Sequence, residues 1–311
     1  MKYLLITLTS VLIFFVTKSQ DIFVGNWNFN HPNNDISISL KIGSPEKNIL
    51  YPAQLNINCD SFHAVYHLLL AKKNSRQLAI GRIKFPITES PFSIDNMTVY
   101  LNGTLDFSKN LKGTPFLSVN RILTKDYEIK IPEVKSFPKE YIPTVQKIYN
   151  SLHDENLELQ KTNEDNWNDS TAFKITQPKK SPSYLGVIDT LFITDKNGTA
   201  HFESNRDNDI VTLKLNDNIL LDQIDSKKSR DNEDFNLDTG LNVIVLFADD
   251  FGRKGTSSAK VNIVLNNVSK RLDFTEKENI ASNFIALKLY LKHNPDDDTK
   301  FQEYYTADWS P

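Results

Sequence analysis

Strict alternation of apolar and polar residues, repeated along the first third of the chain, constrains the fold more than any other feature. Between residues 36 and 42, three isoleucines and Leu40 alternate with polar residues until the run stops at Gly43-Ser44-Pro45. Similar runs follow at residues 53–57 and 62–70. A period of two buries one face of a strand and leaves the other in water, which is typical of antiparallel sheets.

Further short runs continue the pattern. They span residues 78–85, 97–101, 105–107 and 116–122, and Asn102-Gly103 is typical of a tight turn between two of them. Seven or eight short strands at this spacing predict a barrel or a strongly twisted sandwich. We therefore predict a mostly β protein that begins with an antiparallel, barrel-like domain over residues 20–124.

The composition changes between residues 125 and 182, where five prolines interrupt a charged, Asn-rich stretch. This composition predicts a Pro-rich linker. Within it, Pro143 suits the first turn of a helix, and Val145, Ile148, Tyr149 and Leu152 follow at helical spacing. We expect one short helix here, packed on a neighbouring domain.

Strand patterns return over residues 183–293. The runs span residues 187–194, 199–202, 210–215, 219–224, 235–237, 242–248, 259–265, 268–274 and 284–291. Turn sequences at residues 195–198 and 216–218 join neighbouring runs directly, which predicts a second antiparallel domain. The tail over residues 294–311 is acidic and contains Tyr304, Tyr305 and Trp309. We expect this tail to lie over a surface or to be poorly ordered.

The first residues have the layout of a secretory signal. A lysine, an apolar run from Tyr3 to Val16 and small residues before Gln20 predict a signal peptide over residues 1–19, cut after Ser19. The apolar run is shorter than an ordinary membrane span, and no later segment predicts one. We expect an exported protein that is periplasmic, bound at the cell surface or secreted.

Charge and cysteine content exclude some functions. Loss of Lys2 and Lys18 with the signal would change the formal charge from −3 to −5, because each carries one positive charge. This mild acidity, with lysines that are scattered rather than clustered, argues against non-specific binding of nucleic acid or anionic lipid. The chain has a single cysteine, Cys59, so an intramolecular disulfide is excluded.

One triplet, Asp238-Thr239-Gly240, has the form of an aspartic protease signature. Those enzymes pair two catalytic aspartates that share a proton. The chain has one such triplet, so a homodimer would have to supply the second aspartate. The residue that follows is Leu241 rather than a small one, and no distant apolar-apolar-Gly segment supports the turn. We keep Asp238 as a remote catalytic candidate and favour an ordinary turn.

The spacing of the candidate metal ligands in the sequence does not favour a metal site. Cys59, His63 and His67 are spaced by four, but residues four apart in a strand lie about 13 Å apart, too far to share one ion. We therefore predict ordinary strand residues, with Cys59 buried, and no metal site. Two separate groups offer oxygen ligands that would suit a surface calcium: Asp195, Asn197, Asp207 and Asp209 form one, and residues 296–298 form the other. Turn formation explains Asp195 and Asn197 at least as well. No nucleotide or hydrolase motif is present, and no cofactor is expected.

The C-terminal strands resemble a module of exported proteins of Bacteroidota. The pattern is an Asp-x-Ile/Val-x-Leu-x-Leu-Asn strand at residues 209–216, Leu-x-x-Gly-x-Asn-x-Ile-x-Leu-x-Ala at 237–248, and Gly252-Arg253 before Thr256 and Ala259. This chain departs from it at Asp250 and Ser257-Ser258. The resemblance covers about a third of the chain and implies an immunoglobulin-like β-sandwich without known catalytic activity.

The N-terminal domain resembles lipocalin-like barrels more loosely. Gly25-Asn26-Trp27 stands where those barrels carry Gly-x-Trp on the first strand, and Arg121 is placed late enough to cover that ring by a cation–π contact. A carrier of a small apolar ligand would need a cavity behind Trp27, whereas a small closed barrel can also be filled by its own side chains. The candidate lining residues are Trp27, Tyr66, Leu68 and Phe107.

We therefore expect a non-enzymatic binding protein of the cell envelope or exterior. A protein or glycan partner is expected, with exposed aromatic residues as contact points. A lipocalin-like carrier of a small apolar ligand is the alternative. A homodimeric aspartic protease that uses Asp238 is the remote alternative.

Overall fold

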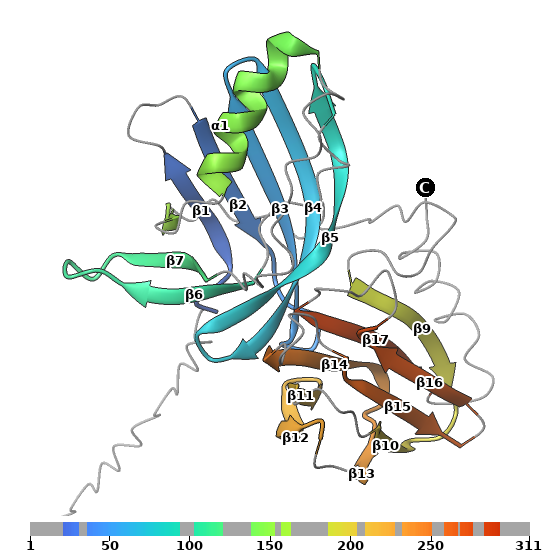
Figure 1. The fold of residues 1–311 in the computed structure, drawn as a ribbon. Coiled ribbons are helices and arrows are strands. Elements are labelled where there is room, and N and C mark those ends of the chain that lie inside the picture. Colours follow the sequence, from blue (N-terminus) through green and yellow to red (C-terminus); the bar gives the residue numbers. More distant parts are fainter. Residues whose placement is uncertain are drawn as a thin grey trace, which may run out of the picture.

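The computed structural model describes residues 21–30, 36–93, 103–120, 138–152, 157–162, 186–203, 209–227, 232–250, 258–266, 268–275 and 283–292. The predicted signal peptide, the run at 97–101, Arg121 and the C-terminal tail lie outside these residues. Figure 1 shows a barrel with one helix beside a second part built from two sheets. In the part of the chain that is described, no helix combines the length and apolar character needed to cross a membrane.

The first part is a closed antiparallel barrel of eight strands in sequence order. Closure comes from pairing of the first strand with the last, Trp27 opposite Lys161. The strands are β1 (Gly25–Asn30), β2 (Ile36–Ile42), β3 (Leu50–Cys59), β4 (Phe62–Asn74), β5 (Gln77–Ser90), β6 (Thr104–Lys109), β7 (Pro115–Asn120) and β8 (Glu158–Lys161). The predicted mostly β fold with an N-terminal barrel is confirmed.

The closing strand β8 lies inside the range that the sequence predicts as linker. It has four residues, of which Leu159 is fully buried, and it joins β7 on one side and β1 on the other. A strand of this length shows too little alternation to be recognised from its own sequence. Its place depends on the two edges that the other seven strands leave open.

Alternation explains the barrel interior. The inward residues of β2, Ile36, Ile38, Leu40 and Ile42, are all at most 3% exposed. They share one core with Trp27 of β1 and with the inward residues of the following strands. Strand β2 and most of β3 bury every second side chain, as the sequence predicts.

A 3-10 turn, η3 (Lys139–Tyr141), leads into α1 (Ile142–Leu152), the predicted short helix. Its apolar stripe, Val145, Ile148 and Leu152, packs into the barrel core. The Asp60 carboxylate, in the turn between β3 and β4, accepts hydrogen bonds from Lys147 Nζ at 3.1 Å and from Thr144 Oγ1 at 3.1 Å. The helix is therefore fixed to the barrel by both apolar and charged contacts.

The second part consists of two sheets that share one hydrophobic core. One sheet has the order β13 (Asn232–Asn236), β10 (Asn197–Glu203), β15 (Lys260–Leu265) and β16 (Val268–Asp273). The other has the order β12 (Asn218–Asp225), β11 (Ile210–Leu215), β14 (Gly240–Asp250), β17 (Phe284–Leu291) and β9 (Val187–Ile193). Each of these strands overlaps one of the nine runs in the sequence.

The prediction of a purely antiparallel second domain is wrong in one respect. Strand β9 runs parallel to β17, with Leu191 opposite Leu289. The turn at residues 195–198 does not join paired neighbours, because β9 lies in the five-stranded sheet and β10 in the four-stranded one. The turn at 216–218 does form the expected hairpin, between β11 and β12. A turn sequence specifies a reversal of the chain and leaves open whether the chain changes sheet.

The two parts meet at an apolar contact between the outer face of β14 and one side of the barrel. Val243, Val245 and Phe247 pack with Leu50 and Leu69 of the barrel in one buried cluster. Ion pairs surround this contact: Lys72–Asp217 at 2.5 Å, Lys73–Asp249 at 2.8 Å and Lys288–Glu46 at 2.7 Å. We call this contact the domain seam.

Candidate ligand groove on the barrel

A groove opens on the barrel beside the turn between β4 and β5. Its volume is about 490 Å³, and it is a shallow hollow that is largely open to solvent. The residues that line it are Asn74, Ser75, Arg76, Gln77, Asp106, Phe107, Ser108 and Ser118. They come from the β4–β5 turn and from β6 and β7.

Local hydrogen bonds hold the turn in place. Asn74 Nδ2 donates to Gln77 Oε1 at 2.7 Å, and Asn74 Oδ1 accepts from the Arg76 backbone N–H at 2.9 Å. The carbonyl of Arg76 accepts from the backbone N–H of Phe107 at 2.8 Å. The turn and β6 are thereby joined, and Arg76 and Phe107 become neighbours in the groove.

Arg76 supplies the free positive charge of the groove. The residue is exposed, and its guanidinium forms no hydrogen bond or ion pair with any residue that the structure describes. The carboxylate in the groove, Asp106, accepts from Thr104 Oγ1 at 2.7 Å. A guanidinium with five unused donors is suited to an anionic group, above all a carboxylate or phosphate.

Phe107 supplies the apolar surface of the groove. Its ring meets that of Trp27 edge to face at 6.3 Å, and that of Phe23 at the same distance. These contacts fix the ring from the core side, so a ligand ring would meet a rigid surface at low entropic cost. The groove therefore combines a preorganised aromatic side chain, a free cation and the hydroxyls of Ser75, Ser108 and Ser118.

The four predicted ligand residues all belong to the barrel core or pack against it. Phe107 lines the groove and its ring contacts that of Trp27, whereas Trp27, Tyr66 and Leu68 are all buried, at most 1% exposed. Trp27 Nε1 donates to the carbonyl of Phe23 at 2.8 Å. The hydroxyl of Tyr66 donates to Glu89.

A cation does lie over Trp27. The sequence suggests Arg121 for this role, and Arg121 is outside the described residues. In the structure, Lys161 Nζ of β8 lies 5.4 Å from the centre of the Trp27 ring. Sequence reasoning missed this contact because β8 was assigned to the linker.

Sequence reasoning also missed Arg76. The Asn74-Ser75-Arg76 turn is an ordinary hairpin connection in the sequence, and Phe107 lies about thirty residues later. Only the pairing of β5 with β6, which sets Gln77 opposite Asp106, brings the two segments together.

Asp238 lies in a turn that leads into β14. Its side chain is 71% exposed and lies 3.8 Å from Lys47 Nζ. Gly240 has a φ of 87°, a conformation that strains any residue with a Cβ. The buried Asn242 amide closes the turn, since Oδ1 accepts from the Asp238 N–H at 2.9 Å and Nδ2 donates to the Asp238 carbonyl at 2.7 Å. These contacts give Gly240 and Asn242 structural roles in the turn.

The candidate metal ligands are placed apart. Cys59 is 1% exposed inside the barrel, as predicted, while the outward His63 ring lies 2.5 Å from Asn58 Oδ1. Burial lowers the pKa of His67. Asp195 Oδ1 accepts from the Asn197 N–H at 3.0 Å, a turn contact. No group of three or more potential metal ligands occurs among the described residues, which do not include Asp207 or residues 296–298.

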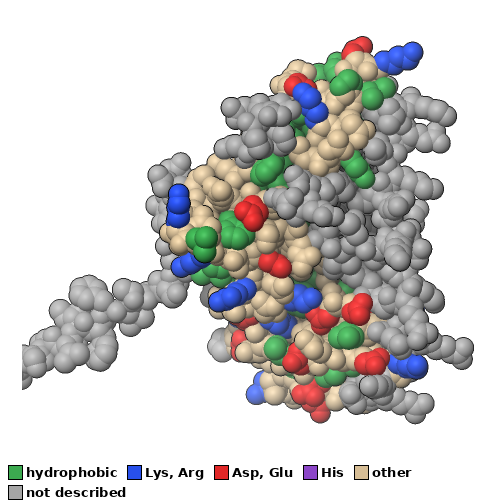
Figure 2. All heavy atoms as spheres, turned by 60° about the vertical axis from the view of Figure 1, so that its left-hand side comes forward, with side chains coloured by type: hydrophobic (Ala, Val, Ile, Leu, Met, Phe, Trp, Pro, Cys, Tyr) green, Lys and Arg blue, Asp and Glu red, His purple; other side chains and the backbone are tan. Residues whose placement is uncertain are grey.

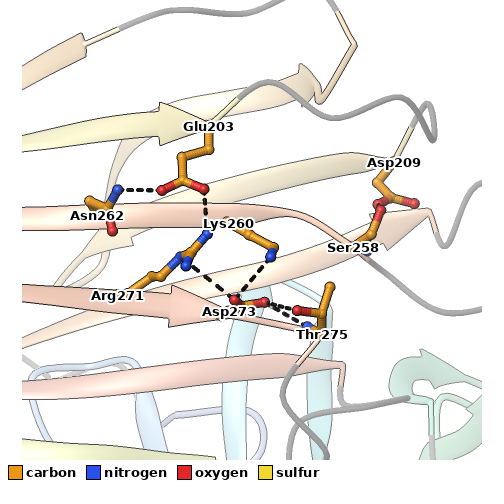
Figure 3. A network of polar contacts seen from close by, with 8 residues as sticks. All are labelled: Glu203, Asp209, Ser258, Lys260, Asn262, Arg271, Asp273 and Thr275. Atoms are coloured by element: carbon orange, nitrogen blue, oxygen red, sulfur yellow. Dashed lines mark hydrogen bonds and ion pairs between the residues drawn. The ribbon is translucent and has the colours of Figure 1, made fainter.

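The outer face of the four-stranded sheet is polar and paired within itself. Figure 3 shows Glu203 between Asn262 and Arg271, and Asp273 among Lys260, Arg271 and Thr275. Nearby, the buried Asp209 carboxylate accepts from the backbone N–H and the hydroxyl of Ser258 at 2.6 and 2.7 Å. Because these charges already satisfy one another, this face offers a ligand fewer free groups than the groove does.

Burial shifts the pKa values of two further groups, Lys214 at the domain seam and Tyr51 in the barrel core. Burial lowers the pKa of Lys214, which Asp217 opposes. Burial and the hydrogen bond to Asp21 raise the pKa of Tyr51. Lys214 Nζ lies 3.7 Å from Asp217 Oδ1 and donates to the carbonyl of Lys72 at 3.3 Å. This cluster joins the two parts of the molecule.

Comparison with known proteins gave no match to a family model, a curated protein or a solved structure.

Proposed function

We propose that this chain is a non-enzymatic binding protein of the cell envelope or exterior, and that its barrel holds a small ligand in the groove beside Phe107. One observation carries the proposal: Arg76, whose guanidinium has no partner among the described residues, and Phe107, whose ring packs on Trp27 and Phe23, line the same groove. The ligand class that fits is a ring or short apolar body with an anionic group. The carboxylate or phosphate meets Arg76, and the apolar body lies on Phe107.

A second candidate function is a lipocalin-like carrier with its ligand inside the barrel. The observations that favour it are the closed eight-stranded barrel, Trp27 on the first strand and the lysine over its ring. In this candidate Tyr66 and Leu68 contact the ligand.

The second part is proposed as an immunoglobulin-like module that supports the barrel or binds a protein or glycan partner. The motif residues have structural positions that suit such a module. Asp209 and Asn216, at the two ends of β11, are 0% and 9% exposed, and Asn242 is 0% exposed. Asn216 Oδ1 accepts from the Val243 N–H at 2.9 Å, so the motif fixes the turns beside β14.

Titration of the whole chain with small aromatic carboxylates and their amide counterparts, followed by NMR chemical shifts, tests the proposed groove. We expect the carboxylates to bind, and Arg76→Gln to weaken them at least tenfold, because a charge-assisted contact is lost. Phe107→Leu should weaken both series. Lys112→Gln, which removes a cation outside the groove, is the matched control.

Two results would contradict the groove as the binding site. One is equal binding of acids and amides to the unmodified protein. The other is binding that survives Arg76→Gln and Phe107→Leu together but disappears in Leu68→Trp, which fills the barrel interior. That second result would establish the carrier function instead.

A further inference from the structure

The hairpin between β6 and β7 projects from the barrel. β6 pairs with β5 as far as Asp106, and β7 pairs with β8 from Phe116 onward, so residues 109–114 extend beyond both neighbouring strands. We call these residues the hairpin tip. Figure 1 shows the hairpin pointing away from the rest of the molecule.

The hairpin tip presents one apolar side chain between two cations. Leu111 is 108% exposed, far more than any other exposed large hydrophobic residue that the structure describes. Lys109 and Lys112 are also exposed, and neither forms an ion pair with a described residue. Lysines of the domain seam such as Lys72 and Lys73, in contrast, each contact a carboxylate. Figure 2, with this side of the molecule turned forward, shows basic side chains next to hydrophobic ones.

The exposure of Leu111 belongs to an ordered turn. Asn110 Oδ1 accepts from the backbone N–H groups of Lys112 at 3.0 Å and Thr114 at 2.9 Å. Asn110 N–H donates to the Thr114 carbonyl at 3.0 Å, and Gly113, with a φ of 80°, completes the turn. The backbone is thus held before any partner arrives, so docking of Leu111 would cost little ordering entropy.

We propose that the hairpin tip docks on the surface of an anionic lipid bilayer, with Leu111 inserted and Lys109 and Lys112 at the level of the head groups. The tip is convex, so a rigid partner would need a matching hollow, whereas a bilayer deforms around an inserted side chain. Lysine stems extend along apolar surface and keep their charge at the interface. Anionic head groups complement the two unpaired cations of a chain that is otherwise mildly acidic.

Flotation of the full chain with vesicles tests this proposal. We expect binding to vesicles that contain phosphatidylglycerol, at least tenfold weaker binding to pure phosphatidylcholine, and loss of affinity as salt is raised. Leu111→Asn should weaken binding about tenfold or more, since burial of one leucine is lost. Lys109→Gln with Lys112→Gln should weaken it about 25-fold, at about fivefold for each cation.

Matched control variants distinguish binding by the hairpin tip from non-specific binding by other exposed apolar or basic residues. Ile219→Asn removes another exposed apolar residue, on β12 and 54% exposed. Lys196→Gln with Lys227→Gln removes two cations from exposed turns. Neither control should change binding by more than about twofold, an effect within ordinary surface variation.

An inserted side chain also gives a direct signal. In a Leu111→Trp variant, the tryptophan emission should shift to shorter wavelength when phosphatidylglycerol vesicles are added, whereas Ile219→Trp should show no shift. Equal binding to both vesicle types would overturn the proposal. Dependence on the two lysines but not on Leu111 would also overturn it, and would indicate electrostatic adsorption to the head groups without insertion of the leucine.

Discussion

Strands β2 and β14 are both central in their sheets, yet they bury their residues differently. In β2 every second residue is buried, and the intervening Lys41 is exposed. In β14 all residues from Asn242 to Ala248 are at most 2% exposed. The barrel closes around its own core, so β2 needs only one apolar face. Strand β14 has the core of the two sheets on one side and the barrel on the other.

This difference shows where to look for a domain contact in a β protein. A continuous apolar run is typical of a strand that is covered on both faces. In this chain the run Val243–Ala248 predicts that Leu246 and the residues on the same face of the strand are buried in the sheet core, which the structure confirms. The residues on the opposite face, Val243, Val245 and Phe247, form the domain seam. The second covering layer is the barrel itself.

Alanine substitutions of adjacent residues should show the largest difference between β2 and β14. In β2, Ile42→Ala should lower the free energy of unfolding by about 2–5 kcal/mol, and Lys41→Ala should change it by less than about 0.5 kcal/mol. In β14, Leu246→Ala and Phe247→Ala should each cost about 2–5 kcal/mol, because both neighbours are buried. Urea unfolding of the four variants measures these differences. A cost for Phe247→Ala as small as that for Lys41→Ala would show that the seam contributes nothing.

The turn before β14 provides a test of intermediate size. Asn242→Ala should cost about 2–3 kcal/mol, because it leaves the part-buried N–H of Asp238 and the carbonyls of Asp238 and Gly240 without their amide partner. The exposed Asn236 on β13 provides the control, and Asn236→Ala should be nearly neutral. Equal unfolding free energies for the two variants would contradict a structural role for Asn242.

A smaller effect is expected from the buried lysine of the seam. Lys214→Met should raise the free energy of unfolding at neutral pH by about 1 kcal/mol, because a desolvated charge is replaced by an apolar side chain. Asp217 keeps its contact with Lys72 at 2.5 Å in this variant. Urea unfolding at pH 7 measures the difference. A loss of stability in Lys214→Met would mean that the charge contributes more than its burial costs.

The pH dependence sharpens this test. Burial lowers the pKa of Lys214 in the folded chain below 10.5, its ordinary value. Between the two pKa values the unfolded chain holds more protons, so stability should rise with pH in that interval. Lys214→Met should lack this rise, as urea unfolding from pH 7 to pH 10 would show. The same rise in Lys214→Met would assign it to another group.

Several features of the fold could be predicted from local pattern because the physical cause is local. Alternation in β2 to β4 specifies strands with one buried face, and the stripe of Val145, Ile148 and Leu152 specifies a helix. The buried positions of Trp27 and Cys59 follow from the same alternation. None of these features depends on which distant segment becomes the neighbour.

Features that depend on a distant neighbour could not be predicted. Strand β8 forms by pairing with the edges of β1 and β7. Strand β9 lies parallel to β17, a strand far from it in the sequence. The groove needs Arg76 and Phe107 from different hairpins. The sequence therefore determined which segments become strands and which faces are apolar, since periodicity acts within a few residues. The tertiary structure decided which edges pair, which second face the barrel covers and which charges remain unpaired, because these are contacts between segments far apart in the chain.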